Sequence, residues 1–128
     1  MKDVTAAIII KGEEVLIARR APGEKHAGSW EFPGGKVEAG ETPEACLKRE
    51  LAEEFGIEVK VQGFVKSSLY EYPQGSIRLL AYRVKILHGE IELRAHDRYE
   101  WVGVKQLPNY ELLPADVPIA DYLREYLS

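Results

Sequence analysis

The segment from Gly35 to Ile57 constrains the fold of this chain most, because it contains a helix with two different faces. Thr42 followed by Pro43 is typical of a helix N-terminus, and Gly56 is typical of a helix C-terminus. Between them an apolar residue recurs every four positions, at Leu47, Leu51 and Phe55. This stripe predicts that the helix packs against a hydrophobic core.

The same helix carries Glu50, Glu53 and Glu54 at spacings of three and four residues, which gathers the three carboxylates along one face. One interpretation is a solvated acidic surface. The other is a site for divalent metal, because hard cations prefer carboxylate oxygens and offset their mutual repulsion. The Pro-Gly-Gly turn that ends at Gly35 favours the metal site, since glycines allow the backbone to approach a ligand closely.

The rest of the chain has the pattern of a mixed α/β domain. Apolar and β-branched runs predict strands at residues 4–10, 15–19, 58–71, 76–87 and 98–102, with turns at 11–14, 72–75 and 104–107. A further hairpin is expected through residues 88–90. Residues 116–127 predict a closing amphipathic helix whose inward side chains are Ile119, Tyr122, Leu123 and Tyr126. We expect one domain, residues 1–128, with a mixed sheet sandwiched between helices.

Composition limits the partners. The chain has 128 residues and is 45% hydrophobic, which is enough for one hydrophobic core. Its net charge of -4 disfavours binding to nucleic acid polymers. Its single cysteine, Cys46, cannot form an internal disulfide, and the N-terminus has no leader pattern or membrane span. We therefore expect a cytoplasmic protein, monomer or homodimer, that binds a small nucleotide.

These residues carry a resemblance to a known family. The Gly35–Ile57 segment fills every fixed position of the Nudix box, G-x5-E-x7-R-E-U-x-E-E-x-G-U, where U is an apolar aliphatic residue. Residues 18–21 and the Trp-Glu-Phe-Pro-Gly-Gly-Lys run at 30–36 are similar to the MutT-like branch of this family. The resemblance implies the Nudix fold and hydrolysis of nucleoside triphosphates.

Hydrolysis of a phosphoanhydride requires charge neutralisation, an oriented water and a base. We expect Mg²⁺, with Mn²⁺ as an alternative, to bridge the phosphates to Glu53, Glu54 and the Gly34 carbonyl. Glu50 is expected to be the base or a second metal ligand. The resemblance also implies that Glu100, outside the box, is a metal ligand or base.

Several other side chains are expected to support the site. Arg49 neighbours the acidic cluster, and a guanidinium binds a carboxylate in bidentate fashion, so Arg49 is predicted to pair with Glu41. Lys36 and Arg20 are the candidates for phosphate contacts, although Arg20 is as compatible with a solvated surface position. Phe32 in the 30–36 run is a further substrate-binding candidate. His96 is expected in a surface loop, with a position that lines the cleft as the less favoured alternative.

The nucleobase preference depends on Asp116. The Leu-Pro-Ala-Asp-Val-Pro run at 113–118 is similar to the CTP pyrophosphohydrolase branch, whereas members specific for oxidised guanine carry Asn in place of Asp116. An ionised carboxylate only accepts hydrogen bonds and suits an exocyclic amine. Two alternatives stay open: Asp116 caps the closing helix, or burial keeps it protonated and able to donate to a guanine oxygen.

The sequence thus predicts an enzyme that converts nucleoside triphosphates into monophosphates and pyrophosphate, preferring cytidine-type or modified amino-bearing bases. The alternative is an 8-oxo-dGTP diphosphatase. Less favoured are a hydrolase of other nucleoside diphosphate derivatives and a nucleotide-binding module without turnover, since Glu50, Glu53 and Glu54 are all present.

Overall fold

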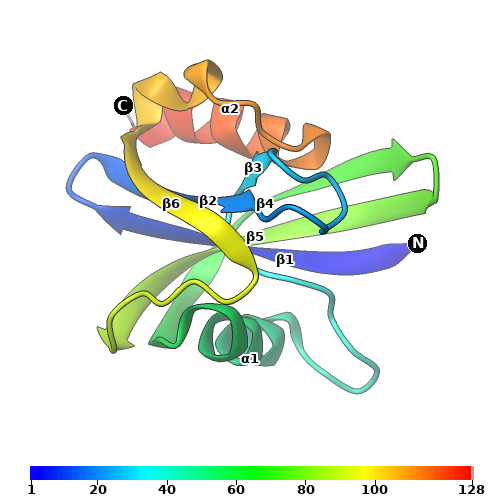
Figure 1. Ribbon diagram of the computed structural model, residues 1–128, viewed down its shortest axis with the longest axis horizontal. Helices are drawn as coiled ribbons and strands as arrows, with labels where there is room; N and C mark the ends of the chain where they lie inside the picture. Colours follow the sequence, from blue (N-terminus) through cyan, green and yellow to red (C-terminus); the bar gives the residue numbers. More distant parts are fainter. Residues whose placement is uncertain (128) are drawn as a thin grey trace.

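The computed structural model describes residues 1–127 and places a six-stranded mixed sheet between two helical layers (Figure 1). The strands are β1 (Lys2–Lys11), β2 (Glu14–Arg20), β3 (Trp30–Glu31), β4 (Glu58–Tyr72), β5 (Gly75–His88) and β6 (His96–Gly103). Helix α1 (Pro43–Phe55) covers one face and α2 (Val117–Leu127) the other. This arrangement confirms the predicted sandwich.

The sheet order is β3-β2-β1-β5-β4, with β6 paired to β2. Strands β1 and β5 run parallel, and the other pairs are antiparallel. Because side chains alternate between the two faces of a strand, β1 and β2 supply both cores at once. Ile8 and Ile17 face α2, whereas Ile9 and Leu16 face α1.

Helix α1 has the ends and the apolar stripe that the sequence predicts. The Thr42 hydroxyl accepts a hydrogen bond from the Ala45 N–H at 3.1 Å, and Gly56 ends the helix with φ of 67°. The stripe of Leu47, Leu51 and Phe55 is fully buried in the core on this face. Glu50 and Glu54 lie along the flank of the helix beside this stripe, and Glu53 lies on the exposed side.

The expected hairpin at residues 88–90 is wrong. After β5 the chain crosses the C-terminal end of α1, where the backbone N–H groups of Glu92 and Arg94 donate to the Phe55 and Glu54 carbonyls. The Arg94 guanidinium donates to the Ala52 and Glu53 carbonyls as well. The unpaired carbonyls at the end of a helix need hydrogen-bond donors, so these bonds hold the segment against α1. The strand that follows, β6, then pairs with β2.

Other differences are smaller. The two-residue strand β3 was not expected, and the predicted turn at 104–107 is a 3₁₀ helix, Val104–Asn109. A second 3₁₀ turn, Pro114–Asp116, precedes α2. Ile119 and Leu123 face the core as predicted, but Tyr126 is exposed and packs against Tyr122 instead. No helix within residues 1–127 is long and apolar enough to cross a membrane.

We predict that Leu51→Ala lowers the free energy of unfolding by about 2–5 kcal/mol, because it removes buried methyl groups and leaves a cavity under α1. The matched control is Leu69→Ala, at a side chain that is 65% exposed, which should change stability by less than about 0.5 kcal/mol. Urea unfolding of both variants measures the difference. Equal losses in the two variants would contradict the described packing of α1.

Candidate active site

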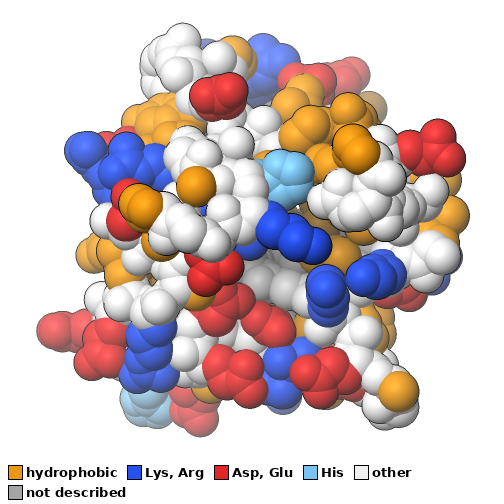
Figure 2. Space-filling view, turned by 45° about the vertical axis from the view of Figure 1, so that its right-hand side comes forward, with side chains coloured by type: hydrophobic (Ala, Val, Ile, Leu, Met, Phe, Trp, Pro, Cys, Tyr) orange, Lys and Arg blue, Asp and Glu red, His pale blue; other side chains and the backbone are white. Residues whose placement is uncertain are grey.

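One cleft of about 950 Å³ collects most of the predicted site residues. It is lined by the start of β1, the loops that follow β2 and β3, one face of α1, the β4–β5 turn and the 3₁₀ turn before α2. On this side of the molecule, acidic and basic side chains border one another around a hollow (Figure 2). The cleft therefore offers groups for both metal and phosphate.

The turn at Gly34 and Gly35 holds one wall of the cleft. The Thr5 N–H donates to the Gly35 carbonyl at 2.7 Å, and the Ala7 N–H donates to the Pro33 carbonyl at 2.6 Å, so the turn is tied to β1. A Cβ on Gly34 would collide with the Thr5 carbonyl, and one on Gly35 would collide with the Glu50 carboxylate. Only glycine permits this close approach.

Arg49 joins this turn to the helix. Its guanidinium donates to both oxygens of Glu41, at 2.7 and 2.9 Å, which confirms the predicted bidentate pair. It also donates to the Lys36 carbonyl at 3.0 Å and to Glu50 at 2.7 Å. The hydrogen bonds from Arg49 hold the pKa of Glu41 down at about 2. Arg49 thus orients Glu50 without facing the substrate itself.

The three carboxylates of the Nudix box do not all face the cleft. Glu50 and Glu54 line the cleft, whereas the Glu53 side chain is 61% exposed and lies 3.4 Å from Arg49. Burial raises the pKa of Glu54 to about 8, helped by the neighbouring Glu50 and Glu31 carboxylates. A half-buried carboxyl whose pKa is raised by burial and by neighbouring carboxylates suits a site for a cation.

Glu100 is not brought to this cluster. It pairs across the sheet with Ile17, whose side chain faces α2, and so it lies on the other side of the sheet from α1. Its carboxylate accepts from the Tyr110 hydroxyl at 2.6 Å and from Arg98 at 3.0 Å. The acidic residue outside the box that does line the cleft beside Glu54 is Glu31.

Sequence patterns do not identify Glu31 as a site residue, because its side-chain partners lie on other strands, Arg20 on β2 and His96 on β6. Its Oε2 atom accepts from Arg20 at 3.0 Å and lies 2.8 Å from Nε2 of His96. The His96 ring is buried in β6, contrary to the expected surface loop. Arg20 also donates to the Lys25 carbonyl, so two protein acceptors hold its guanidinium.

Asp116 lies at the floor of the cleft, 4% exposed. One carboxyl oxygen accepts the Phe32 backbone N–H at 2.9 Å, across 84 residues of sequence. Burial, reinforced by the nearby Glu31, raises the pKa of Asp116 well above its usual range. The structure therefore favours the protonated form of Asp116 over the ionised acceptor.

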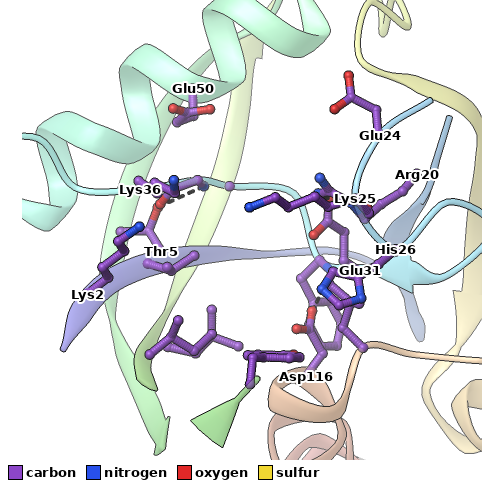
Figure 3. A pocket seen from close by; sticks show the side chains of 18 of the residues that line it. Lys2, Thr5, Arg20, Glu24, Lys25, His26, Glu31, Lys36, Glu50 and Asp116 are labelled. Carbon is purple, nitrogen blue, oxygen red and sulfur yellow. Dashed lines mark hydrogen bonds and ion pairs between the residues drawn. The ribbon is translucent and has the colours of Figure 1, made fainter. Parts of the chain in front are cut away.

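Lys36 reaches the cleft from the glycine turn, as a phosphate contact requires. Lys2 and Lys25 line the same cleft from β1 and from the loop after β2 (Figure 3). Within residues 1–127 none of these three ammonium groups lies in an ion pair. They are therefore free to bind an anionic group that enters the cleft.

Comparison with known proteins agrees with this geometry. Residues 1–126 match the model of the NUDIX domain. The chain belongs to the Nudix family. It is 39% identical to CTP pyrophosphohydrolase of Escherichia coli K12 over 121 residues, 94% of this chain and 90% of the relative. It is 36% identical to 8-oxo-dGTP diphosphatase of the same organism over 127 residues, 97% of this chain and 98% of the relative.

The solution structure of the E. coli ORF135 protein superposes with a TM-score of 0.89 at 37% identity, covering 100% of this chain and 91% of that one. Nudix hydrolases generally need a divalent metal. Among residues 1–127, no three His, Cys, Asp or Glu side chains form a ready metal-binding group. The oxygens that fit a hard cation are those of Glu50 and Glu54, together with the Gly34 carbonyl, for which the described residues provide no hydrogen bond.

The raised pKa of Glu54 predicts how stability depends on pH in the metal-free protein. Folded Glu54 keeps its proton up to about pH 8, while the unfolded chain releases it near 4.5. The folded state thus binds more protons between these values, and the free energy of unfolding falls as pH rises through this interval. Below pH 4.5 both states are protonated and Glu54 has no effect.

We expect urea unfolding in EDTA, measured from pH 5 to pH 8, to show a steeper decline for wild type than for Glu54→Gln. Asp116 contributes a decline of the same sign to both proteins, so the difference between them isolates Glu54. Glu92→Gln, at an exposed carboxylate, is the matched control and should keep the wild-type slope. Identical slopes in wild type and Glu54→Gln would refute the raised pKa.

Proposed function

We propose that this chain is a Mg²⁺-dependent nucleoside triphosphate pyrophosphohydrolase, with Mn²⁺ as the alternative ion. The observation that carries the proposal is the arrangement of the cleft. Glu50 lies at one end, Asp116 lies at the other, Glu31 lies between them, and free ammonium groups lie along the wall (Figure 3). Glu54 lines the cleft from the same helix as Glu50, and its pKa is affected by Glu31. A nucleotide whose phosphates lie at the carboxylate end places its base against Asp116.

The groups of the cleft divide the reaction between them, and Glu50 serves two of its steps. Glu50 and Glu54, with the Gly34 carbonyl, would hold the metal, which supplies charge neutralisation for the phosphates. Glu50, held by Arg49 and facing the cleft, accepts the proton of the attacking water. A bond forms between the water oxygen and phosphorus, the α–β phosphoanhydride bond breaks, and the products are the nucleoside monophosphate and pyrophosphate. Lys36 binds the phosphate oxygens.

The base pocket presents a donor beside an acceptor. Protonated Asp116 donates, and Glu31 accepts, because a carboxylate has no proton to give. A cytosine edge offers N3 as acceptor next to the N4 amine as donor, which matches this pair. We therefore keep cytidine-type and modified amino-bearing nucleotides as the preferred substrates, with the amine bound by Glu31 and not by Asp116.

Oxidised guanine is the second candidate, because its O6 acceptor and N1–H donor match the same pair in the reverse order. The relatives support both, since one is named CTP pyrophosphohydrolase and another 8-oxo-dGTP diphosphatase. The Phe32 backbone fixes only one oxygen of Asp116, so the other is available to either base.

We predict that Glu54→Gln lowers kcat for metal-dependent pyrophosphate release by roughly 100-fold or more, because an amide keeps the shape of the side chain but cannot neutralise a cation. The assay incubates the protein with Mg²⁺ and CTP, dCTP, 5-methyl-dCTP, 2-hydroxy-dATP or 8-oxo-dGTP. Glu92→Gln should retain wild-type rates. The absence of metal-dependent pyrophosphate release from every triphosphate would reject the proposed function.

For Asp116 we predict that Asn supports the wild-type order of substrates, whereas Leu lowers kcat/KM about 10-fold to 100-fold. An amide can accept from Phe32 and donate to the base, as the protonated carboxyl does, but Leu can do neither. The same nucleotide panel measures both variants. A changed substrate order in Asp116→Asn would show that Asp116 acts as an ionised acceptor.

A further inference from the structure

The buried His96 side chain connects Glu31 in the cleft to helix α1. Its side chain is 2% exposed, and the ring stacks on Phe55 with centroids 5.1 Å apart and planes at 25°. Phe55 is adjacent in sequence to Glu54. On the other side, Nε2 of His96 lies 2.8 Å from Oε2 of Glu31.

The surroundings of the ring specify which nitrogen carries the proton. Nδ1 of His96 is buried and has no partner among the described residues. In a neutral ring, a proton on Nδ1 would leave a buried N–H donor without an acceptor and would set the Nε2 lone pair against a carboxylate oxygen. The proton therefore belongs on Nε2, where it is donated to Glu31.

The two oxygens of Glu31 are consequently unequal. Oε2 accepts from both Arg20 and His96, whereas Oε1 has no hydrogen-bond partner within residues 1–127. Oε1 is not among the buried polar atoms that lack a partner, and Glu31 lines the cleft with Asp116. The protein thus saturates one oxygen and leaves the other as a free acceptor at the base pocket.

We propose that His96 is a positioning residue that determines base selection by holding Glu31 as an oriented hydrogen-bond acceptor. This role rests on the proposed function and adds to it the group that receives the amine of the base. Arg20 lies on the solvent side of Glu31, with 26% of its side chain exposed, and it also serves the loop carbonyl of Lys25. The His96 side chain is buried, so water cannot take the place of its hydrogen bond to Glu31.

The test combines kinetics with the tautomer of the ring. His96→Leu should lower kcat/KM for the preferred nucleotide about 10-fold or more, mainly through KM, because a hydrogen bond to a charged group is lost. His96→Gln, whose amide can donate from a position similar to Nε2, should return kcat/KM to within about threefold of wild type. His88→Leu, at a side chain that is 81% exposed, is the matched control and should behave as wild type.

A double-mutant cycle separates positioning from general packing. In a Glu31→Gln background, His96→Leu should cause little further loss, because the carboxylate that it positions is absent. Long-range ¹H–¹⁵N spectra of wild type should show the proton on Nε2, and this measurement does not depend on activity or on the folding of any variant.

Additive losses in the cycle, an unchanged KM in a folded His96→Leu protein, or a proton on Nδ1 would each overturn the role of His96. If wild type releases no pyrophosphate from any triphosphate, the proposed function fails. In that case the nitrogen spectra still decide whether His96 donates to Glu31.

Discussion

The hydrogen bonds of the Arg49 guanidinium hold the catalytic end of the cleft together. One planar cation binds both oxygens of Glu41, the Lys36 carbonyl and the Glu50 carboxylate, so the glycine turn, its following loop and α1 are fixed by a single group. Lysine has neither the planar shape nor the number of donors for this arrangement. Without Arg49, Glu41 and Glu50 would lose the cation that they share, and Glu50 would lose the guanidinium that holds it against Gly35.

The far end of α1 is organised in an equally specific way. Its last carbonyls, from Ala52 to Phe55, receive donors from the chain between β5 and β6, both from backbone and from the Arg94 side chain. These hydrogen bonds fix where β6 begins and therefore where His96 lies. The capped helix end thus supports the base pocket as well as the helix, because His96 then stacks on Phe55 and reaches Glu31.

Local patterns in the sequence predict α1, its caps, its two faces, the Arg49–Glu41 pair and the sandwich, because each depends on spacing within a few residues or on one strong motif. The contacts that complete the base pocket are different in kind. The bond from Phe32 to Asp116 spans 84 residues, and that from His96 to Glu31 spans 65. Periodicity contains no information on such pairs, so the sequence predicts a surface loop for His96 and does not identify Glu31. It also does not show that Glu100 lies on the face of the sheet away from α1.

Glu31 also explains why the two ends of the cleft are not independent. Its negative charge contributes to the raised pKa of Glu54 on one side and to that of Asp116 on the other. Because one carboxylate acts on both groups, removing its charge would lower the pKa of Glu54 and that of Asp116 together.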